Sequence, residues 1–466
     1  MERLIPAGEI RPVACSEVAD SRLGIGFEKL DRDVFDPEKA YDPIAKTGVK
    51  WIRLQSGWQR TERVRGAYDF SWLDSIVDNL ILRGLRPWIC LCYGNELYDD
   101  LAKTVFGAVG CPPVKTPEQR AAWTAYVTAL TRHFAGRVRW YEIWNEPDWC
   151  WKTGPDGTEY GVFAVATAHA IRAGDPDAKV IGGCVCQPSL AWLTEAFEAG
   201  MGPEIDALTF HEYTADETLV QERVGALRAL CRRYNPKIEI IQGESGSQSR
   251  SGGHGALREG AWTEERQAKQ LLRHAVADLK AGVKFSSYFS TVDMIEALNG
   301  KVGDLSSYLD YGYFGVLGAV FDENGRASGT YEPKKSYYAL QRLAALLAES
   351  PEVTDLPIVS LPQASERIFG RDLGIRDLTT CGFAKKGSSA FAYWTPSDLM
   401  TTSFEGTVSF QCSALPSAPR LADPMDGKIY SFPDSMIRID GRHSYTLQNV
   451  PVRDYPLFLL FGDFLP

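Results

Sequence analysis

Two glutamates, Glu146 and Glu244, have the surroundings that most suggest chemistry. Glu146 lies in "WYEIWNEPDW", residues 140–149, where a strand-like apolar run ends in Asn-Glu-Pro. Glu244 ends a second apolar run, "IEIIQGE", which begins at Ile238. The proline after Glu146 biases this residue away from the helical region, so its carboxyl group can project from the strand end. Two carboxyl groups that flank a glycosidic bond are the minimal machinery for its hydrolysis.

A single glutamate after a strand is weak evidence for a catalytic role, because glutamates in exposed loops are common. The pair is more informative if both strands belong to one barrel, since the catalytic groups of a barrel lie at the carboxyl ends of its strands. Glu142 and Glu239 lie earlier in the same runs, and we expect them to be structural partners inside the barrel or at its base.

The elements that must position the pair are eight apolar runs, which alternate with helix-period segments. Nearly continuous apolar runs are typical of parallel strands buried on both faces. They predict an α/β fold, a (β/α)8 barrel over residues 21–349. An open doubly wound sheet is the competitor, but no G-x-G-x-x-G follows the first run. The runs begin at Leu23, Val49, Arg86, Val138, Ala178, Ile205, Ile238 and Val283.

Helices are predicted between these runs, from apolar residues at i, i+3, i+4 and i+7. The clearest one follows Thr116-Pro117-Glu118-Gln119, which is typical of a capping box with proline at the first helical position. The other predicted helices cover 71–84, 158–174, 189–199, 220–234, 263–281 and 334–348.

The pattern changes after about residue 350, where short alternating runs are separated by turn signals such as Asp426-Gly427 and Asp440-Gly441. This predicts a C-terminal antiparallel β-sandwich over residues 350–466. Residues 1–20 are a candidate segment to pair with it.

Composition excludes several classes of protein. The net charge is −10 and the pI is about 5.3, which argues against a nucleic-acid partner and against a basic membrane-binding surface. No apolar run reaches the roughly 18 residues of a membrane helix, and the N-terminus lacks the apolar core of a signal peptide. Ten scattered cysteines then predict reduced thiols in a cytoplasmic protein. Cys90-x-Cys92 and Cys184-x-Cys186 leave a metal site as a minor alternative, but we predict no metal and no cofactor.

The ends of the predicted strands carry most of the remaining candidates for binding a substrate, because a barrel builds its site there. Tryptophans 149 and 151 are further candidates, as platforms for sugar rings, although packing under the loop is a close alternative. The substrate-binding candidates are Glu28, Arg53, Trp58, Tyr93, Asn145, Trp149, His211, Tyr213, Tyr288 and Phe289.

Several of these motifs resemble those of known enzymes. "W-N-E-P" at 144–147 and "Q-G-E-S-G" at 242–246 resemble the two glutamate motifs of glycoside hydrolase clan A. "H-E-Y" at 211–213, "SYFSTVDMIE" at 287–296 and "GYFGVL" at 312–317, followed by "EPKKSYYAL", resemble family 39, the β-xylosidase and α-L-iduronidase type. The resemblance covers the barrel and extends to the sandwich.

This resemblance implies a retaining glycosidase that acts from the chain end on short oligosaccharides or glycosides. Glu146 would be the general acid/base and Glu244 the nucleophile. Asn145 would hydrogen-bond the sugar 2-hydroxyl, and Arg53 would keep Glu244 ionised. Tyr213 would hydrogen-bond Glu244, and His211 would line the pocket.

One position departs from the clan. The clan usually has tryptophan at the end of the eighth strand as a floor for the sugar, and the aligned residue here is Phe289. The smaller ring puts a β-xylosidase assignment in doubt and favours a pentose-type or substituted glycone.

Other functions are weighed against this one. A non-catalytic carbohydrate-binding barrel would keep the aromatics but need not keep both glutamates, and a transglycosylase would use the same site. A serine hydrolase is disfavoured because 243–247 does not fit G-x-S-x-G, and a metal hydrolase because 211–215 lacks the second histidine of H-E-x-x-H. The oligomeric state stays open, with a homo-oligomer compatible.

Overall fold

The computed structural model describes residues 1, 3–104, 111–149, 154–296, 310–361, 367–368, 371–372 and 378–465. Trp151, one of the two predicted sugar platforms, lies outside the described residues.

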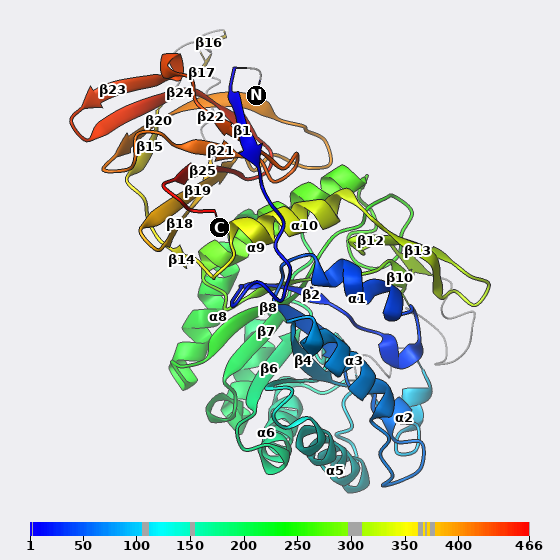
Figure 1. The fold of residues 1–466 in the computed structure, drawn as a ribbon. Helices are drawn as coiled ribbons and strands as arrows, with labels where there is room; N and C mark the ends of the chain where they lie inside the picture. The colour runs from blue at the N-terminus through cyan, green and yellow to red at the C-terminus, as the bar shows by residue number, and fades with distance from the viewer. Residues whose placement is uncertain are drawn as a thin grey trace.

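Eight parallel strands form a closed barrel in chain order, so the predicted barrel is confirmed (Figure 1). Each of the eight apolar runs contains one of these strands. Because all eight strands are parallel, their carboxyl ends meet at one face of the barrel. The strands are β2 (Leu23–Gly26), β3 (Trp51–Gln55), β4 (Arg86–Leu91), β5 (Trp140–Ile143), β6 (Lys179–Val185), β7 (Ala207–His211), β8 (Glu239–Ser245) and β9 (Ser286–Tyr288).

Helices surround the barrel and cover its strands (Figure 1). The predicted capping box is present at Thr116, whose side chain accepts from the Gln119 N–H while Gln119 bonds back. The helices are α1 (Glu38–Ala45), α2 (Trp58–Thr61), α3 (Ser71–Leu82), α5 (Pro117–Phe134), α6 (Gly157–Gly174), α7 (Leu190–Ala196), α8 (Val220–Tyr234), α9 (Glu264–Ala281) and α10 (Lys335–Leu346).

The inside of the barrel is built in layers. Trp51, Trp88, Trp140 and Phe285 form a separate buried cluster, in which the rings of Trp51 and Phe285 stack with centroids 4.5 Å apart. Side chains two positions apart on a strand share one face, so Arg53 lies above Trp51 on β3, toward the carboxyl end. The aromatic layer therefore fills the base and a charged layer rests on it.

The C-terminal part forms two antiparallel sheets, as expected for a β-sandwich. One has the order β1-β22-β21-β25-β19-β18-β14 and the other β15-β20-β24-β23. Their strands are β1 (Ile5–Glu9), β14 (Glu352–Val353), β15 (Ile358–Leu361), β18 (Thr379–Lys385), β19 (Ser388–Trp394), β20 (Glu405–Ser413), β21 (Arg420–Ala422), β22 (Lys428–Ser431), β23 (Ile437–Gly441), β24 (Ser444–Arg453) and β25 (Leu457–Phe461).

The sandwich is joined to the barrel by the start of the chain and by buried polar contacts on α9. Strand β1 lies along β22 as an edge strand of the larger sheet (Figure 1). Lys269 on α9 pairs with Asp454 at 3.0 Å, and Arg273 donates to the Ser397 carbonyl at 2.8 Å. Two short hairpins follow β9 on the barrel side, β10 (Met294–Ile295) with β11 (Tyr311–Gly312) and β12 (Leu317–Phe321) with β13 (Ala327–Pro333).

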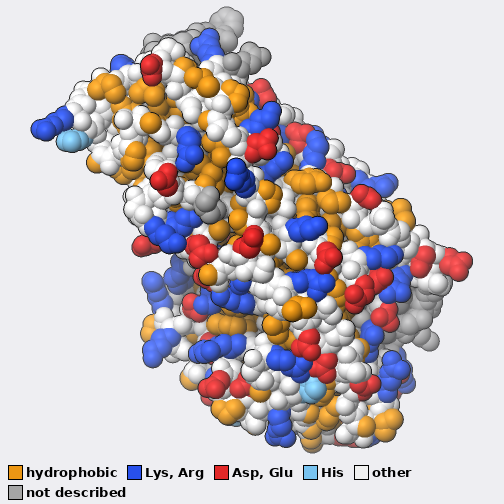
Figure 2. Space-filling model, in the orientation of Figure 1, with side chains coloured by type: hydrophobic (Ala, Val, Ile, Leu, Met, Phe, Trp, Pro, Cys, Tyr) orange, Lys and Arg blue, Asp and Glu red, His pale blue; other side chains and the backbone are white. Residues whose placement is uncertain are grey.

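The molecular surface carries mixed charge. On the face drawn in Figure 2, acidic and basic side chains are interspersed, without a large region of one sign. Among the described helices, none combines the length and the apolar character needed to cross a membrane.

Candidate active site

The two glutamates are presented differently by the backbone. Glu244 lies within β8, whereas Glu146 follows β5 on a turn. Trp144 and Glu146 have φ of 69° and 49°, in the left-handed region that side chains rarely adopt. The Glu146 N–H donates to the Cys184 carbonyl of β6 at 2.9 Å, which fixes the turn. Glu146 thus avoids the right-handed helical region, as predicted, but adopts the left-handed one rather than the extended one that a following proline favours.

The turn brings the two carboxylates together at the barrel mouth. A carboxylate oxygen of Glu146, a carboxylate oxygen of Glu244 and a ring nitrogen of His211 all lie within 4.8 Å of one another. His211, the last residue of β7, has its Nδ1 2.8 Å from Glu146 Oε1 and 3.6 Å from Glu244 Oε2. His211 is fully buried, so it bridges the carboxylates and has no open surface with which to line the pocket.

Glu244 is held by donors on both oxygens. Arg53 Nη1 donates to Oε1, and the Tyr213 hydroxyl donates to Oε2 at 2.6 Å. Burial would raise the pKa of Glu244, but the opposing charges of His211 and Arg53 and the Tyr213 hydrogen bond lower it below its ordinary value. Glu244 is therefore ionised, the form in which a carboxylate can attack an electrophile.

His211 carries the matching charge. Burial would lower the pKa of His211, but the nearby Glu244, followed by Cys184 and Glu146, raises it well above its ordinary value. The imidazolium therefore compensates the negative charge between the two glutamates.

Arg53 organises the charged layer inside the barrel. Its guanidinium is fully buried and contacts four acceptors besides the Cys184 sulfur: Glu244, Glu142 at 2.8 Å, Asn145 Oδ1 at 2.9 Å and Glu28 at 3.4 Å. Glu142 also accepts from the Thr209 hydroxyl at 2.6 Å, so it is a structural partner inside the barrel. Glu239 pairs with Lys284 at 2.8 Å where β8 begins, at the base.

Among the carboxyl groups that contact Arg53, Glu28 lacks a full set of hydrogen-bond partners. It is 1% exposed, and no hydrogen bond reaches its Oε2. Burial, partly offset by Arg53 and reinforced by the charge of Glu244, raises the pKa of Glu28 to about 8. At neutral pH Glu28 is therefore largely a neutral acid beside the Arg53–Glu244 pair, with no open surface for a sugar.

Glu146 has a more open environment, on the β5–β6 side of the mouth. Asp148 Oδ1 accepts from the Cys186 N–H at 2.7 Å and ties the turn to the end of β6. Burial raises the pKa of Asp148 to about 6. Trp149 is 51% exposed, so it can present a ring face to a sugar.

Two further aromatic residues lie at the mouth: Phe289 follows β9, across the barrel from β5, and Tyr93 follows β4, the neighbour of β5. The Phe289 ring packs edge-on against Tyr213, with centroids 6.3 Å apart, and thus stands behind the residue that holds Glu244. The Tyr93 hydroxyl accepts from Gln55 Nε2 at 3.0 Å.

Two predicted substrate-binding residues do not fit that role. Trp58 is fully buried, stacks between Tyr98 and Tyr126, and donates its Nε1–H to Glu62 at 2.6 Å. The Tyr288 hydroxyl donates to the Ser247 carbonyl at 3.4 Å, and the ring is buried. Tyr288 faces away from its neighbour Phe289 because successive strand residues point to opposite faces, so this prediction was wrong. Trp58 packs under the site and meets only the wall of the pocket described below.

Sequence reasoning missed three residues near the site, Lys29, Arg32 and Gln55. Lys29 Nζ lies 5.5 Å from the centre of the Phe289 ring and pairs with Glu296 at 2.9 Å. Gln55 Oε1 accepts from the Lys29 N–H at 3.1 Å and from Arg32 Nη2 at 2.8 Å. The signal available for Gln55 was its spacing, two residues beyond Arg53 on the same face of β3.

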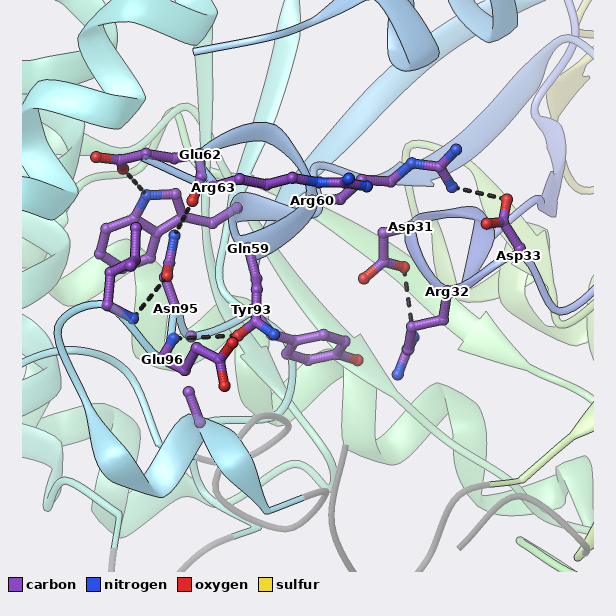
Figure 3. A pocket seen from close by; sticks show the side chains of 14 residues that line it. Asp31, Arg32, Asp33, Gln59, Arg60, Glu62, Arg63, Tyr93, Asn95 and Glu96 are labelled. Atoms are coloured by element: carbon purple, nitrogen blue, oxygen red, sulfur yellow. Dashed lines mark hydrogen bonds and ion pairs between the residues drawn. The ribbon is translucent and has the colours of Figure 1, made fainter. Parts of the chain in front are cut away.

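Next to these residues is a cavity of about 460 Å³, which we call the β2–β4 pocket (Figure 3). Its lining comes from the segments that follow β2, β3 and β4, on the same barrel face as the glutamates. The lining residues are Asp31, Arg32, Asp33, Trp58, Gln59, Arg60, Glu62, Arg63, Tyr93, Gly94, Asn95, Glu96, Leu97 and Ala102.

Among the described residues, two clusters have ligand atoms close enough for a metal ion, Glu146 with His211 and Glu244, and Glu142 with Cys90 and Cys184. Arg53 contacts Glu244 in the first cluster, and Glu142 and Cys184 in the second. Burial also raises the pKa of both cysteine thiols, which disfavours the thiolate that a metal would need. The donor sets therefore fit a guanidinium cation better than a metal.

Known proteins resemble this chain over part of its length. Residues 45–223 match the family model for glycosyl hydrolases family 39. Among curated proteins, a beta-xylosidase of Geobacillus stearothermophilus is 31% identical over 219 residues, 42% of each chain. One of Caldicellulosiruptor saccharolyticus is 29% identical over 189 residues, 36% of this chain and 37% of the relative. The matches thus span about two fifths of these relatives.

Solved structures share the whole fold at lower identity. A family 39 glycoside hydrolase from Bacteroides cellulosilyticus WH2 superimposes with a TM-score of 0.65 and 17% identity, covering 95% of this chain and 81% of that one. The GH39 enzyme from Xanthomonas axonopodis pv. citri gives 0.60 and 18%, covering 97% and 94%. Together with the family model, which spans the segment carrying Glu146 and His211, these findings support the resemblance to glycoside hydrolase family 39.

Proposed function

We propose that the chain is a retaining glycoside hydrolase that cleaves its substrate by double displacement. The observation that carries this proposal is the approach of Glu146 and Glu244 oxygens to within 4.8 Å. Carboxyl groups of retaining enzymes lie about 5–5.5 Å apart, and those of inverting enzymes roughly 6.5–9.5 Å apart, to leave room for a water molecule. The short approach favours direct attack by one carboxylate.

In the first step Glu244, held ionised by Arg53, His211 and Tyr213, attacks the anomeric carbon. The bond to the leaving oxygen breaks as Glu146 donates a proton to that oxygen, and a glycosyl ester of Glu244 forms. In the second step Glu146 takes a proton from water, which attacks the same carbon and releases Glu244. Asn145, bonded to Arg53, is oriented to reach the sugar 2-hydroxyl.

The ester step also changes the charge near His211. Once Glu244 is esterified, its negative charge no longer raises the pKa of His211, so this pKa falls. His211 remains bonded to Glu146 at 2.8 Å while Glu146 changes from acid to base. His211 is therefore a positioning residue for Glu146 in both steps.

The test is the configuration of the first-formed sugar, followed by NMR before mutarotation. We expect the anomeric configuration of the substrate to be retained. A first product of inverted configuration would refute double displacement.

For the substrate, we propose a substituted glycone, or a pentose-type glycone other than simple unsubstituted β-xylose, removed from a short oligosaccharide or glycoside. Both curated relatives are named beta-xylosidase, which favours a pentose. Phe289 in place of the expected tryptophan leaves room for a bulkier sugar. Assay of aryl glycosides of xylose, arabinose, galactose, glucose and uronic acids tests this, and the highest kcat/KM on the simple β-xyloside would refute it.

We also propose a reducing, cytoplasmic environment. The nine described cysteines, Cys150 being outside the described residues, form no disulfide, and eight of them are buried. Export of the native protein with its activity into culture medium would contradict this location.

A further inference from the structure

We infer that the β2–β4 pocket is a subsite for a second, neutral sugar unit, attached to the glycone that reacts at Glu244. This inference rests on the proposed function and names the substrate more closely. It is drawn from the position of the pocket, the pairing of its charges and its size.

The position follows from a chain of contacts at the barrel mouth. Arg53 on β3 holds Glu244, and Gln55, two residues further toward the mouth, bonds both Tyr93 and Arg32. Tyr93 and Arg32 line the pocket, and the Arg32 guanidinium lies 5.1 Å from the centre of the Tyr93 ring. These two side chains therefore form a wall shared by the pocket and the catalytic site.

The same contacts place the pocket on the side of the glycone, the sugar that reacts at Glu244. Gln55 also bonds the backbone of Lys29, which lies over Phe289, the residue at the expected position of the sugar floor. The acid/base Glu146 faces the leaving group, and its turn is tied to β6 through Cys186. A substituent that reaches the β2–β4 pocket thus extends from the reacting sugar, away from the bond that breaks.

The charges of the lining favour a neutral ligand. Arg60 pairs with Asp33 at 2.8 Å, and Arg32 lies 3.4 Å from Asp31. Glu62 accepts from the Trp58 indole, the Tyr98 hydroxyl and the Gly66 N–H. With most charges compensated by neighbours, a phosphate or a uronate finds no concentrated opposite charge, whereas sugar hydroxyls can bond to the outer oxygens and nitrogens of such pairs.

The size and the available groups agree with a sugar. A volume of about 460 Å³ lies within the usual range of ligand sites, roughly 300–1,000 Å³. Figure 3 shows Gln59 and Glu96 on one side of the cavity and Asp31 and Arg32 on the other, with the Tyr93 ring between them. The side-chain carbonyl of Gln59 accepts from the Glu96 N–H at 3.1 Å, and the amide nitrogen of Gln59 can donate to a sugar hydroxyl.

The experiment compares matched substrates on the full chain: 4-nitrophenyl β-xyloside with β-xylobioside, and 4-nitrophenyl β-glucoside with β-cellobioside. We expect kcat/KM to be about 10-fold or more higher for the disaccharide in at least one pair, because a second sugar adds several hydrogen bonds of about 1 kcal/mol each. We also expect the intact disaccharide as the first product.

A double variant separates the pocket from the catalytic site. Gln59→Ala with Glu96→Ala should remove most of the disaccharide preference and leave kcat/KM on the monosaccharide within about 2-fold. The matched control is Gln221→Ala with Glu222→Ala, an exposed Gln and Glu on α8, which should change neither value.

The outcomes distinguish the two proposals. Hydrolysis of a monosaccharide glycoside without preference for its disaccharide, or with stepwise release of single sugars, overturns the subsite and leaves the proposed function standing. A preference that survives in the pocket variant also overturns the subsite. No hydrolysis of any aryl glycoside by the wild type overturns both.

Discussion

The β8 side and the β5 side of the barrel mouth each present one glutamate, and they treat it in opposite ways. Glu244 lies inside a strand, is 7% exposed, and has a cation and a hydroxyl on its oxygens. Glu146 lies on a turn with left-handed backbone, is more exposed, and has one strong partner, His211. The difference fits the two tasks proposed above, in which Glu244 is a fixed, charged nucleophile and Glu146 is the general acid/base.

The Glu244→Ala variant gives the strongest test of this difference between the two glutamates. We expect a loss of activity greater than the roughly 10⁴-fold upper range for a general acid–base group, whatever the leaving group, because no nucleophile remains. Azide should restore turnover by direct attack and give the glycosyl azide of inverted configuration, identified by NMR. A retained azide from this variant would mean that the roles are reversed.

Glu146→Ala tests the other side. On a natural oligosaccharide we expect a loss of about 10²–10⁴-fold, because the poor leaving group needs protonation. On an activated aryl glycoside the first step should change little, and the covalent intermediate should accumulate, since deglycosylation lacks its base. Azide should then give the retained glycosyl azide, and mass spectrometry of the quenched enzyme should detect the intermediate. Full activity of both alanine variants on an oligosaccharide would place catalysis elsewhere.

The Tyr213→Phe variant tests how Glu244 is kept ionised. A hydrogen bond to a charged group contributes about 1.5–3 kcal/mol, so kcat/KM should fall roughly 10–100-fold. The bond lowers the pKa of Glu244, so its removal should raise that pKa and move the acid limb of the pH–kcat/KM profile to higher pH. The control is Tyr288→Phe, whose hydroxyl bonds the Ser247 carbonyl, and whose acid limb should stay in place. Equal shifts in both variants would contradict the assignment.

Glu28→Gln should have the smallest effect on activity at neutral pH, because glutamine resembles the neutral acid. Burial raises the folded-state pKa of Glu28 from 4.5 to about 8. The stability that Glu28 contributes by this shift is therefore complete below pH 4.5 and is lost as the pH rises toward 8. Between pH 5 and 8.5 the Tm of the wild type should thus fall more than that of the variant.

The control for this comparison is Glu239→Gln at the base, where the carboxylate is exposed and pairs with Lys284. Its Tm should follow the wild type across the same pH range. Parallel Tm curves for the wild type and Glu28→Gln would show that Glu28 is ionised throughout.

Sequence reasoning identified the barrel because parallel strands buried on both faces leave a continuous apolar signal, which all eight runs showed. It also found Glu146 and Glu244, because each ends such a run and all the carboxyl ends of a parallel barrel meet. The local signal was likewise sufficient for the capping box at Thr116.

The directions in which side chains point beyond the strand ends could not be predicted from the sequence in this way. Trp58 and Tyr288 are of the right type and near the right place, but which way they point depends on packing against Tyr98, Tyr126 and Ser247, which are distant in sequence or in a loop. The β2–β4 pocket could not be predicted as one cavity for the same reason. Its lining comes from three loops, and only the closure of the barrel brings them together.

The pairing of β1 with β22 has a consequence for how the molecule is completed. Glu9 lies beside Lys428, and β1 is an exposed edge strand that carries Pro6 and an irregularity before Gly8. At the usual 5–20 residues per second, the roughly 420 residues between the partners take about 20–80 s to synthesise. Strand β1 therefore waits for its neighbour while those residues are synthesised, and its proline and bulge are features that make an unpaired edge a poor template for other chains in the meantime.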